Sequence, residues 1–342
     1  GTDNIDRFLM TDSSTGTSVQ WAPVRVPFRR RLQTLAILFW TMTGPLFAFF
    51  WGLLICALLA VSPLAWPLLI VYLVYFYFDK SPQTGGRKWM WVRRMPVWRL
   101  CRDYFPARLV KTVELDPKQS YLFGYHPHGI ISVGAFLNFA TEATGFSTLF
   151  PGVDLRVLTL KMNFLSPFIR EYWLSFGFCD VSRESIRALF KQGSSPMIVV
   201  GGAREALDAH PKATQLTLIC RKGFVREALL AGASLVPVFA FGENDLYDQL
   251  ENKRGSILRE RQEKLMRWFG FSMPLFQGRG VFNYTFGILP QRRPLTAVVG
   301  APIPLPKLEN PSREQILKYH TIYVEALRQL FEDHREKYAQ PG

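Results

Sequence analysis

Two histidines stand one residue apart in the stretch YHPHG, where His126 and His128 flank Pro127 and precede Gly129. Imidazole is the side chain whose ordinary pKa best suits a general base near neutral pH. Proline fixes one backbone dihedral, and glycine permits a tight turn or the close approach of a ligand. Such a turn would hold both rings stiffly, so the pattern predicts general-base catalysis by one of the two histidines.

This prediction of a histidine base has three alternatives. The rings could be structural, each satisfied by backbone contacts. A metal site is the second alternative, but no carboxylate or third histidine lies nearby in the sequence, so we predict no metal. The third is a covalent acyl-cysteine formed on Cys179 or Cys220, although neither thiol has a neighbouring histidine in the sequence.

Two further stretches offer partners for such a base. In MIVVGGAREAL, Gly201 and Gly202 follow an apolar run, where backbone amides could face an oxyanion or a phosphate. Glu205 in the same stretch could orient and charge-stabilise an imidazole, or it could cap a helix. In CDVSRES, Arg183 could grip a phosphate or a carbonyl group, or lie on a helix surface.

Polar residues also follow two other apolar runs. Arg221 and Lys222 in CRKGFVREAL come just before a helix that begins with glycine, a place suited to phosphate groups. Glu243 and Asn244 end the apolar stretch LVPVFAFGEND and would emerge at one rim of a sheet. We therefore include these four residues among the candidate substrate-binding residues.

Short apolar runs would form the strands that position these residues. They cover residues 121–125, 155–160, 197–201, 216–220, 235–239 and 295–300. They lack clean alternation, as expected for strands covered on both faces. Amphipathic stretches between them predict helices, so residues 79–342 are expected to form an α/β domain with a mostly parallel sheet. Open sheets of this class bind ligands at the carboxyl ends of their strands.

A long stretch without charged side chains precedes this domain, over residues 32–78. About 20 apolar residues span a bilayer as a helix, and Pro63 and Pro67 would break the stretch. It predicts a membrane-embedded helical hairpin, either crossing or re-entrant, after a basic cytosolic segment over residues 1–31. Basic residues on both sides favour the cytosol for both ends. A signal peptide or a pair of buried core helices are the alternatives.

The amino-acid composition indicates which classes of molecule this protein binds. A formal charge of +14 and a pI near 9.8 predict an anionic partner. Zinc-ligand spacing, a helix-turn-helix pattern and long basic blocks are missing from the sequence, so nucleic acid is not predicted. With 48% hydrophobic and 14% aromatic residues, the composition favours lipid. The 4 cysteines lack paired spacing, which indicates a reducing compartment rather than a disulfide framework.

The order of these motifs resembles the type-2 diacylglycerol acyltransferases, with their monoacylglycerol and acyl-CoA wax alcohol acyltransferase relatives. The matching stretches, from about residue 102 to 331, are RDYFPARLVKT, YLFGYHPHGIISVGAFLNFATEATGFSTLFPG, IREYWLSFGFCDVSRESI, VVGGAREAL, RKGFVREALLAGASLVPVFAFGENDLYDQ, GRGVFNYTFGILPQRRPLTAVVGAPIPLPK and YHTIYVEALRQLF. The uncharged hairpin before them also fits the family.

The resemblance implies an enzyme of the endoplasmic reticulum membrane, with its catalytic domain facing the cytosol, that associates with lipid droplets. It would transfer an acyl group from acyl-CoA, a co-substrate, to diacylglycerol, releasing triacylglycerol and coenzyme A, with no other cofactor. Monoacylglycerol and long-chain alcohols are alternative acceptors. A membrane-wedged lipid-binding scaffold of lipid droplets is the non-enzymatic alternative, and formation of a homo-oligomer is left open.

The resemblance also bears on the roles of single residues. Some relatives replace the first histidine of the motif and keep the Pro-His step, which implies His128 rather than His126 as the base. The distantly related glycerol-phosphate acyltransferases use a His-x4-Asp motif, but neither histidine here has that Asp. The acid is therefore expected elsewhere, with Glu205 as the candidate. The substrate-gripping arginine of those relatives is carried onto Arg183.

Overall fold

The computed structural model describes residues 19–44 and 47–339. Residues 1–18, the larger part of the expected basic segment, lie outside the described residues. The described helices are α2 (Phe28–Thr43), α3 (Ala48–Val61), α4 (Trp66–Phe78), α5 (Met90–Arg93), α6 (Pro96–Tyr104), α7 (Val133–Ala135), α8 (Phe146–Leu149), α9 (Ile169–Ser175), α10 (Arg183–Lys191), α11 (Gly202–Ala206), α12 (Gly223–Ala231), α13 (Ile257–Phe269) and α14 (Arg313–Tyr338). The strands are β1 (Arg108–Lys111), β2 (Tyr121–His126), β3 (Leu155–Thr159), β4 (Cys179–Asp180), β5 (Ser195–Val199), β6 (Ser234–Phe241), β7 (Asp248–Gln249), β8 (Phe276–Gln277) and β9 (Thr296–Val299).

Seven strands form one sheet in the order β1-β9-β6-β2-β5-β3-β4. Strands β2, β3, β4, β5 and β6 are mutually parallel, whereas β9 pairs with β6 in the antiparallel sense and β1 runs parallel to β9. The prediction of an α/β domain with a mostly parallel sheet is confirmed. The carboxyl ends of β2, β5 and β3 lie side by side at one edge, where ligands bind in such sheets.

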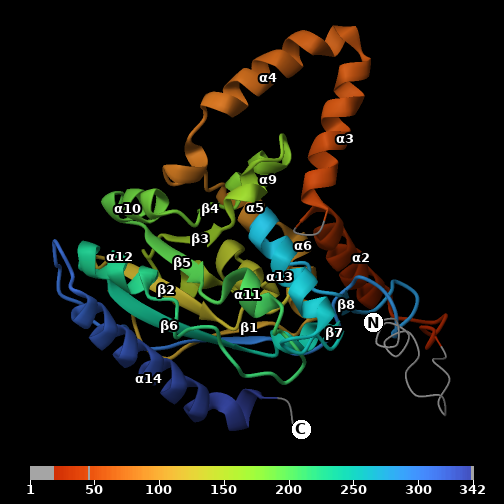
Figure 1. The fold of residues 1–342 in the computed structure, drawn as a ribbon. Helices are drawn as coiled ribbons and strands as arrows, with labels where there is room; N and C mark the ends of the chain where they lie inside the picture. Colours follow the sequence, from red (N-terminus) through yellow and green to blue (C-terminus); the bar gives the residue numbers. More distant parts are fainter. Residues whose placement is uncertain (1–18, 45–46, 340–342) are drawn as a thin grey trace.

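Helices cover both faces of this sheet (Figure 1). Alternate residues of each strand point to opposite faces, so Phe123 on β2 enters the core beneath α2 and α6, while the adjacent Leu122 enters the core beneath α10, α12 and α14. In the first core, Trp40 of α2 and Trp98 of α6 both pack against Phe136, with ring centroids 5.2 and 5.3 Å apart. Burial on both faces explains why the strands read as continuous apolar runs.

One predicted strand is wrong, and four of the described strands, β1, β4, β7 and β8, were not predicted. Residues 216–220 form a loop, because the backbone N–H of Thr217 donates to Glu205 and the carbonyl of Leu218 bonds to His320, instead of pairing in a ladder. The run expected at 197–201 forms β5 two residues earlier. Strands β1 and β4 are short and carry charged residues, so no apolar run marked them.

The uncharged stretch does not form one hairpin from its first residue. Its opening part continues α2, which packs against α6 and buries Ala36, Ile37 and Trp40 in the core of the domain. The expected boundary at residue 32 therefore differs from the structure, since α2 belongs to the folded domain. Only α3 and α4 extend away from the sheet, as an arch (Figure 1). The break between them lies at residues 62–65, as the prolines predict.

The α4 side of the arch is attached to the segment around α9. The ring of Tyr72 stacks on Phe168 with centroids 4.2 Å apart, and its hydroxyl accepts the Phe168 N–H at 2.6 Å. Arg170 donates to the carbonyl of Phe76 at 2.7 Å. The outer surface of the arch is apolar; for example, Leu64 is 90% exposed.

Among the described helices, none has by itself the length and apolar composition needed to cross a bilayer. One bent pair, Phe50–Val61 with Pro63–Gln83, meets this test jointly, with a bend of 111° at the break.

Candidate active site

The first histidine of the motif, His126, is the last residue of strand β2 and is buried. His126 is fully buried, and the peptide bond to Pro127 is cis. Its Nε2 lies 3.0 Å from the hydroxyl of Tyr323 on α14, which itself donates to the carbonyl of Gly124 at 3.1 Å. Because that hydroxyl proton is already used, Nε2–H of His126 donates to Tyr323. Burial lowers the pKa of His126 to about 3, so the ring stays neutral inside the domain.

The second histidine is half-buried, and hydrogen bonds hold its backbone and one of its ring nitrogens. Nδ1 of His128 lies 3.0 Å from the carbonyl oxygen of Gly129. A carbonyl only accepts hydrogen bonds, so Nδ1 holds the proton and Nε2 keeps its lone pair. The hydroxyl of Ser132 donates to the carbonyl of His128 at 2.8 Å and braces the turn. The neutral tautomer of His128 is therefore ready to accept a proton at Nε2.

Glu205 lies beside the motif but meets its backbone rather than its ring. Oε1 accepts the N–H of His128 at 2.7 Å, and Oε2 accepts the N–H of Thr217 at 2.7 Å. The side chain is 3% exposed. The imidazole of His128 does not donate to this carboxylate, because its Nδ1–H is given to the carbonyl of Gly129 instead. Glu205 therefore positions the turn and acts on the imidazole through its charge.

The surroundings of His128 include groups that lower the pKa of its ring and groups that raise it. Burial lowers the pKa of His128, and the nearby positive charge of Arg221 lowers it further. The carbonyl of Gly129 and the negative charge of Glu205 raise it. The resulting pKa lies below the ordinary value for histidine, so the ring is an unprotonated base at neutral pH.

The position of Glu205 requires glycine at residue 201, and the backbone conformation favours glycine at residue 202. A Cβ on Gly201 would lie 2.2 Å from Cδ of Glu205, and Gly202 has a φ of +63°. Arg221 donates to the carbonyl of Gly201 at 3.3 Å, which ties this exposed guanidinium to the motif side of the sheet. The structure thus gathers His128, Glu205, Gly201 and Arg221. The oxyanion role of the two glycine amides stays a prediction.

Glu243 is not at an exposed rim but buried beneath the turn. Its Oε2 accepts the hydroxyl of Tyr125 at 2.6 Å and the N–H of Gly134 at 2.9 Å, while Oε1 has no recorded partner. A Cβ on Gly129 would lie 2.8 Å from Cγ of Glu243, so only glycine fits there. Burial raises the pKa of Glu243 to about 7. This carboxyl supports the motif from below.

Three predicted binding residues lie outside this cluster. Asn244 is buried and donates to the carbonyl of Ala213 at 2.7 Å. Arg183 is exposed on α10, and its recorded ion pair is with Glu227, at 3.9 Å. Lys222 is half-buried at the start of α12, without a recorded contact to the motif. Their binding roles stay predictions.

The two cysteines named for a covalent route differ in their surroundings. Cys179 is fully buried, and burial raises its pKa to about 12, which keeps the thiol protonated. Cys220 is exposed on the loop before α12. All 4 cysteines are free, as their spacing predicts.

Several residues of the site were not identified from the sequence. Tyr323 looked like one apolar residue of a long helix, and Tyr125 like one residue of a buried strand. Thr217 fell in a segment predicted as a strand, and Ser132 in an apolar run. A hydroxyl at the end of an otherwise apolar strand was the one available sign, in the case of Tyr125.

The family model described as diacylglycerol acyltransferase matches residues 58–341. The chain belongs to the diacylglycerol acyltransferase family. It is 47% identical over 324 residues to diacylglycerol O-acyltransferase 2 of Dictyostelium discoideum, covering 94% of this chain and 97% of that relative. It is also 47% identical over 327 residues to 2-acylglycerol O-acyltransferase 1 of Bos taurus, with the same two shares covered. This member of the diacylglycerol acyltransferase family is an acyltransferase.

Among solved structures, the chain is similar to the 1-acyl-sn-glycerophosphate acyltransferase of Thermotoga maritima. The TM-score is 0.40 at 11% identity, and the match covers 88% of this chain and 97% of that one.

Proposed function

We propose that this acyltransferase moves a fatty acyl group from acyl-CoA to the hydroxyl of diacylglycerol, with Nε2 of His128 as the general base. The observation that carries the proposal is the tautomer of His128, because the Gly129 carbonyl at 3.0 Å holds the proton on Nδ1. The lowered pKa of the ring supports it. His126 is not suited to this role, since its ring is fully buried and its Nε2–H is donated to Tyr323 within the fold.

The reaction proceeds in two proton transfers. Nε2 of His128 takes the proton from the acceptor hydroxyl as its oxygen attacks the thioester carbonyl carbon. The tetrahedral intermediate carries an oxyanion, for which we propose the backbone amides near Gly201 and Gly202 as donors. When the carbon–sulfur bond breaks, the imidazolium returns the proton to the thiolate of coenzyme A. The products are an ester and free coenzyme A, and the base is regenerated.

Glu205 and Arg221 adjust this cycle in opposite senses. The negative charge of Glu205 stabilises the imidazolium that forms during attack, whereas the positive charge of Arg221 disfavours it. Arg221 is exposed and is suited to a phosphate of coenzyme A. A bound phosphate would neutralise this arginine and remove its effect on His128. The base would then become stronger when acyl-CoA is in place.

We assign the enzyme to the endoplasmic reticulum membrane and to lipid droplets, with the arch of α3 and α4 in lipid. The exposed apolar surface of the arch supports this assignment. Monoacylglycerol stays a second candidate acceptor, since relatives of equal identity carry names with different acceptors.

The test is turnover by the purified full chain in liposomes with radiolabelled oleoyl-CoA. Diacylglycerol, monoacylglycerol and a long-chain alcohol are supplied separately. We expect triacylglycerol from the wild type and a loss of about 10²–10⁴-fold in His128→Ala. His334→Ala is the matched control, because the contacts recorded for that ring are within its own helix, with the carbonyl of Leu330 and the ring of Tyr338. Another product would change the acceptor and keep the base.

Two results would contradict the proposal. Wild-type rates in His128→Ala would remove the assigned base. No turnover with any acceptor, in protein shown to be folded, would favour the scaffold alternative.

A further inference from the structure

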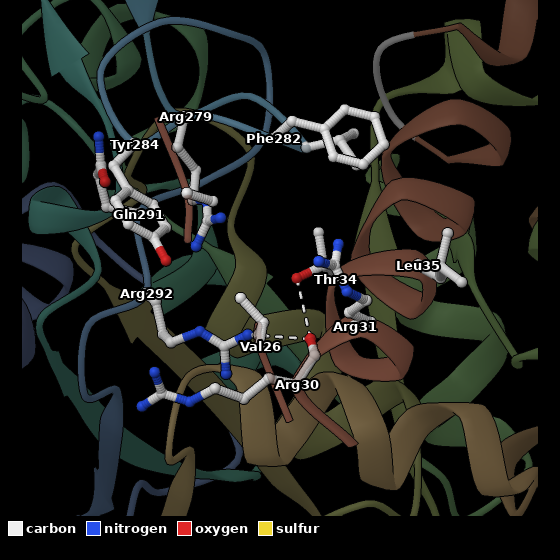
Figure 2. A pocket seen from close by; sticks show the side chains of 12 residues that line it. Val26, Arg30, Arg31, Thr34, Leu35, Arg279, Phe282, Tyr284, Gln291 and Arg292 are labelled. Atoms are coloured by element: carbon white, nitrogen blue, oxygen red, sulfur yellow. Dashed lines mark hydrogen bonds between the residues drawn. The ribbon is translucent and has the colours of Figure 1, made fainter. Parts of the chain in front are cut away.

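A cavity lined by several arginines lies away from the histidine motif, between α2 with the segment before it and the loop over residues 279–292. Its volume is about 450 Å³, and its lining includes Arg30, Arg31, Arg279 and Arg292 (Figure 2). None of its lining residues belongs to the cluster around His128. One lining residue, Gln291, donates its N–H to the carbonyl of Leu246 at 2.6 Å, which joins the cavity wall to the segment after Glu243.

The four arginines are not neutralised by the part of the chain that the structure describes. No ion pair is recorded for any of them, and their polar contacts are mainly with carbonyl groups. Arg31 donates to the carbonyl of Val24 at 2.8 Å, and Arg279 donates to that of Gly280 at 3.2 Å. Arg292 donates to the side chain of Gln33. These neutral acceptors leave the full positive charge in the cavity.

Arg279 is an exception among the buried arginines of the described residues. Arg93, Arg170 and Arg259 are each ion-paired, with Glu142, Asp79 and Asp208 among their partners. Arg279 is only 7% exposed, yet within residues 19–44 and 47–339 no ion pair is recorded for it. A buried charge is costly unless it is paired. For the other buried arginines the described residues supply the partner, so the charge of Arg279 favours the binding of an anion in this cavity.

The arginines also repel one another. Burial lowers the pKa of Arg292, and the charges of Arg30 and Arg279 lower it further, against the effect of the Tyr104 ring beneath it. Bringing a dianion such as a phosphate into the cavity would remove this repulsion. Guanidinium groups match phosphate oxygens in bidentate geometry.

The surroundings of the cavity are apolar and exposed. Phe28 is 75% exposed, Phe282 is 63% exposed and Trp21 is 70% exposed. Figure 2 shows Phe282 and Leu35 beside the arginines. Helix α2, which forms one wall, leads directly toward the arch. A ligand here would place its charge on the arginines and an apolar part along these side chains.

We propose that this cavity binds the phosphate group of an anionic amphiphile. Two sources share that chemistry, a membrane phospholipid with a phosphate monoester head group and the acyl-CoA donor. The proposal does not depend on the role of His128, because binding is measured without turnover.

The test measures affinities of the full chain in neutral detergent by calorimetric titration. The probes are dioctanoylphosphatidic acid, oleoyl-CoA and dioctanoylglycerol, which has no phosphate. The variant is Arg30→Gln with Arg292→Gln. The control, Arg261→Gln with Arg313→Gln, removes the same charge from exposed arginines for which no ion pair is recorded. We expect the cavity variant to bind at least one phosphate probe about tenfold or more weakly than the control, with dioctanoylglycerol unaffected.

The outcomes separate the sources. Loss limited to phosphatidic acid assigns a phospholipid site, loss limited to oleoyl-CoA assigns a donor site, and loss of both assigns one site open to either. Equal affinities of the cavity and control variants for both phosphate probes would overturn the proposal. Arg30 is exposed and Arg292 half-buried, so this pair tests the cavity without removing the buried Arg279.

Discussion

The substitution Glu205→Gln tests how the turn is held. The carboxylate gives one oxygen to the N–H of His128 and the other to that of Thr217, each at 2.7 Å. Glutamine keeps one acceptor and turns a donor toward the second amide. Losing one charge-assisted hydrogen bond costs about 1.5–3 kcal/mol, so we expect the free energy of unfolding to fall by about 2 kcal/mol. A displacement near 1 Å at the base costs about 10²-fold, and we expect kcat to fall by that order.

The same substitution has a pH signature. The charge of Glu205 raises the pKa of His128, so its removal lowers that pKa. Protonated His128 cannot accept a proton, and activity is therefore lost as the pH falls through its pKa. In Glu205→Gln this acid limb of the kcat/KM profile should lie at a lower pH than in the wild type.

The assay is initial-rate formation of radiolabelled product between pH 5 and 9, with denaturant unfolding of the same samples. Glu227→Gln is the matched control, because Glu227 is also 3% exposed but bonds to Arg187 instead of the motif. The control should lose stability and keep the acid limb in place. An acid limb in folded Glu205→Gln identical to that of the wild type, with kcat unchanged, would refute the positioning role of this carboxylate.

Three further predictions follow from neighbouring contacts. Tyr323→Phe leaves the buried Nε2–H of His126 without an acceptor, so thermal denaturation should show a loss of about 1–3 kcal/mol, whereas an unchanged Tm would contradict that contact. Gly201→Ala places a Cβ 2.2 Å from Cδ of Glu205, so turnover should fall with the fold retained; wild-type turnover would mean that Glu205 can move freely. Glu243 has a folded pKa raised to about 7 from 4.5, so its contribution to stability is present below pH 4.5 and lost as the pH rises through 7. In denaturant unfolding, the free energy of unfolding should fall between pH 5 and pH 8 by about 3 kcal/mol less in Glu243→Gln than in the wild type. An equal fall in both proteins would refute this.

The sheet was largely predictable because its strands are buried on both faces. Continuous apolar runs located β2, β3, β6 and β9 to within a few residues. The apolar run at 216–220 was wrongly predicted as a strand, because a strand and a partly buried loop can share the same composition. What separates them is where the backbone amides bond, and the acceptor for Thr217 is a side chain twelve residues earlier in the chain.

The sequence predicted that His128 and Glu205 lie together, but not the contacts between them. Both residues stood out because histidine next to proline and glycine, and a carboxylate after paired glycines, are uncommon in buried runs. Which atom of Glu205 meets which atom of His128 depends on how β2 and β5 are paired, and periodicity does not carry that information. The burial of Glu243 was missed because a charged residue after a strand usually reaches solvent.

The arch is attached to the folded domain along α4, where Tyr72 stacks on Phe168 and the carbonyl of Phe76 accepts a hydrogen bond from Arg170. These contacts set the position of the domain relative to the arch. With the arch in lipid, the height of the catalytic turn above the membrane would be fixed, and acceptors would be met by lateral diffusion. Turnover would then follow the mole fraction of acceptor within the surface rather than its bulk concentration. Diluting diacylglycerol with phosphatidylcholine, at constant total acceptor, should slow the enzyme.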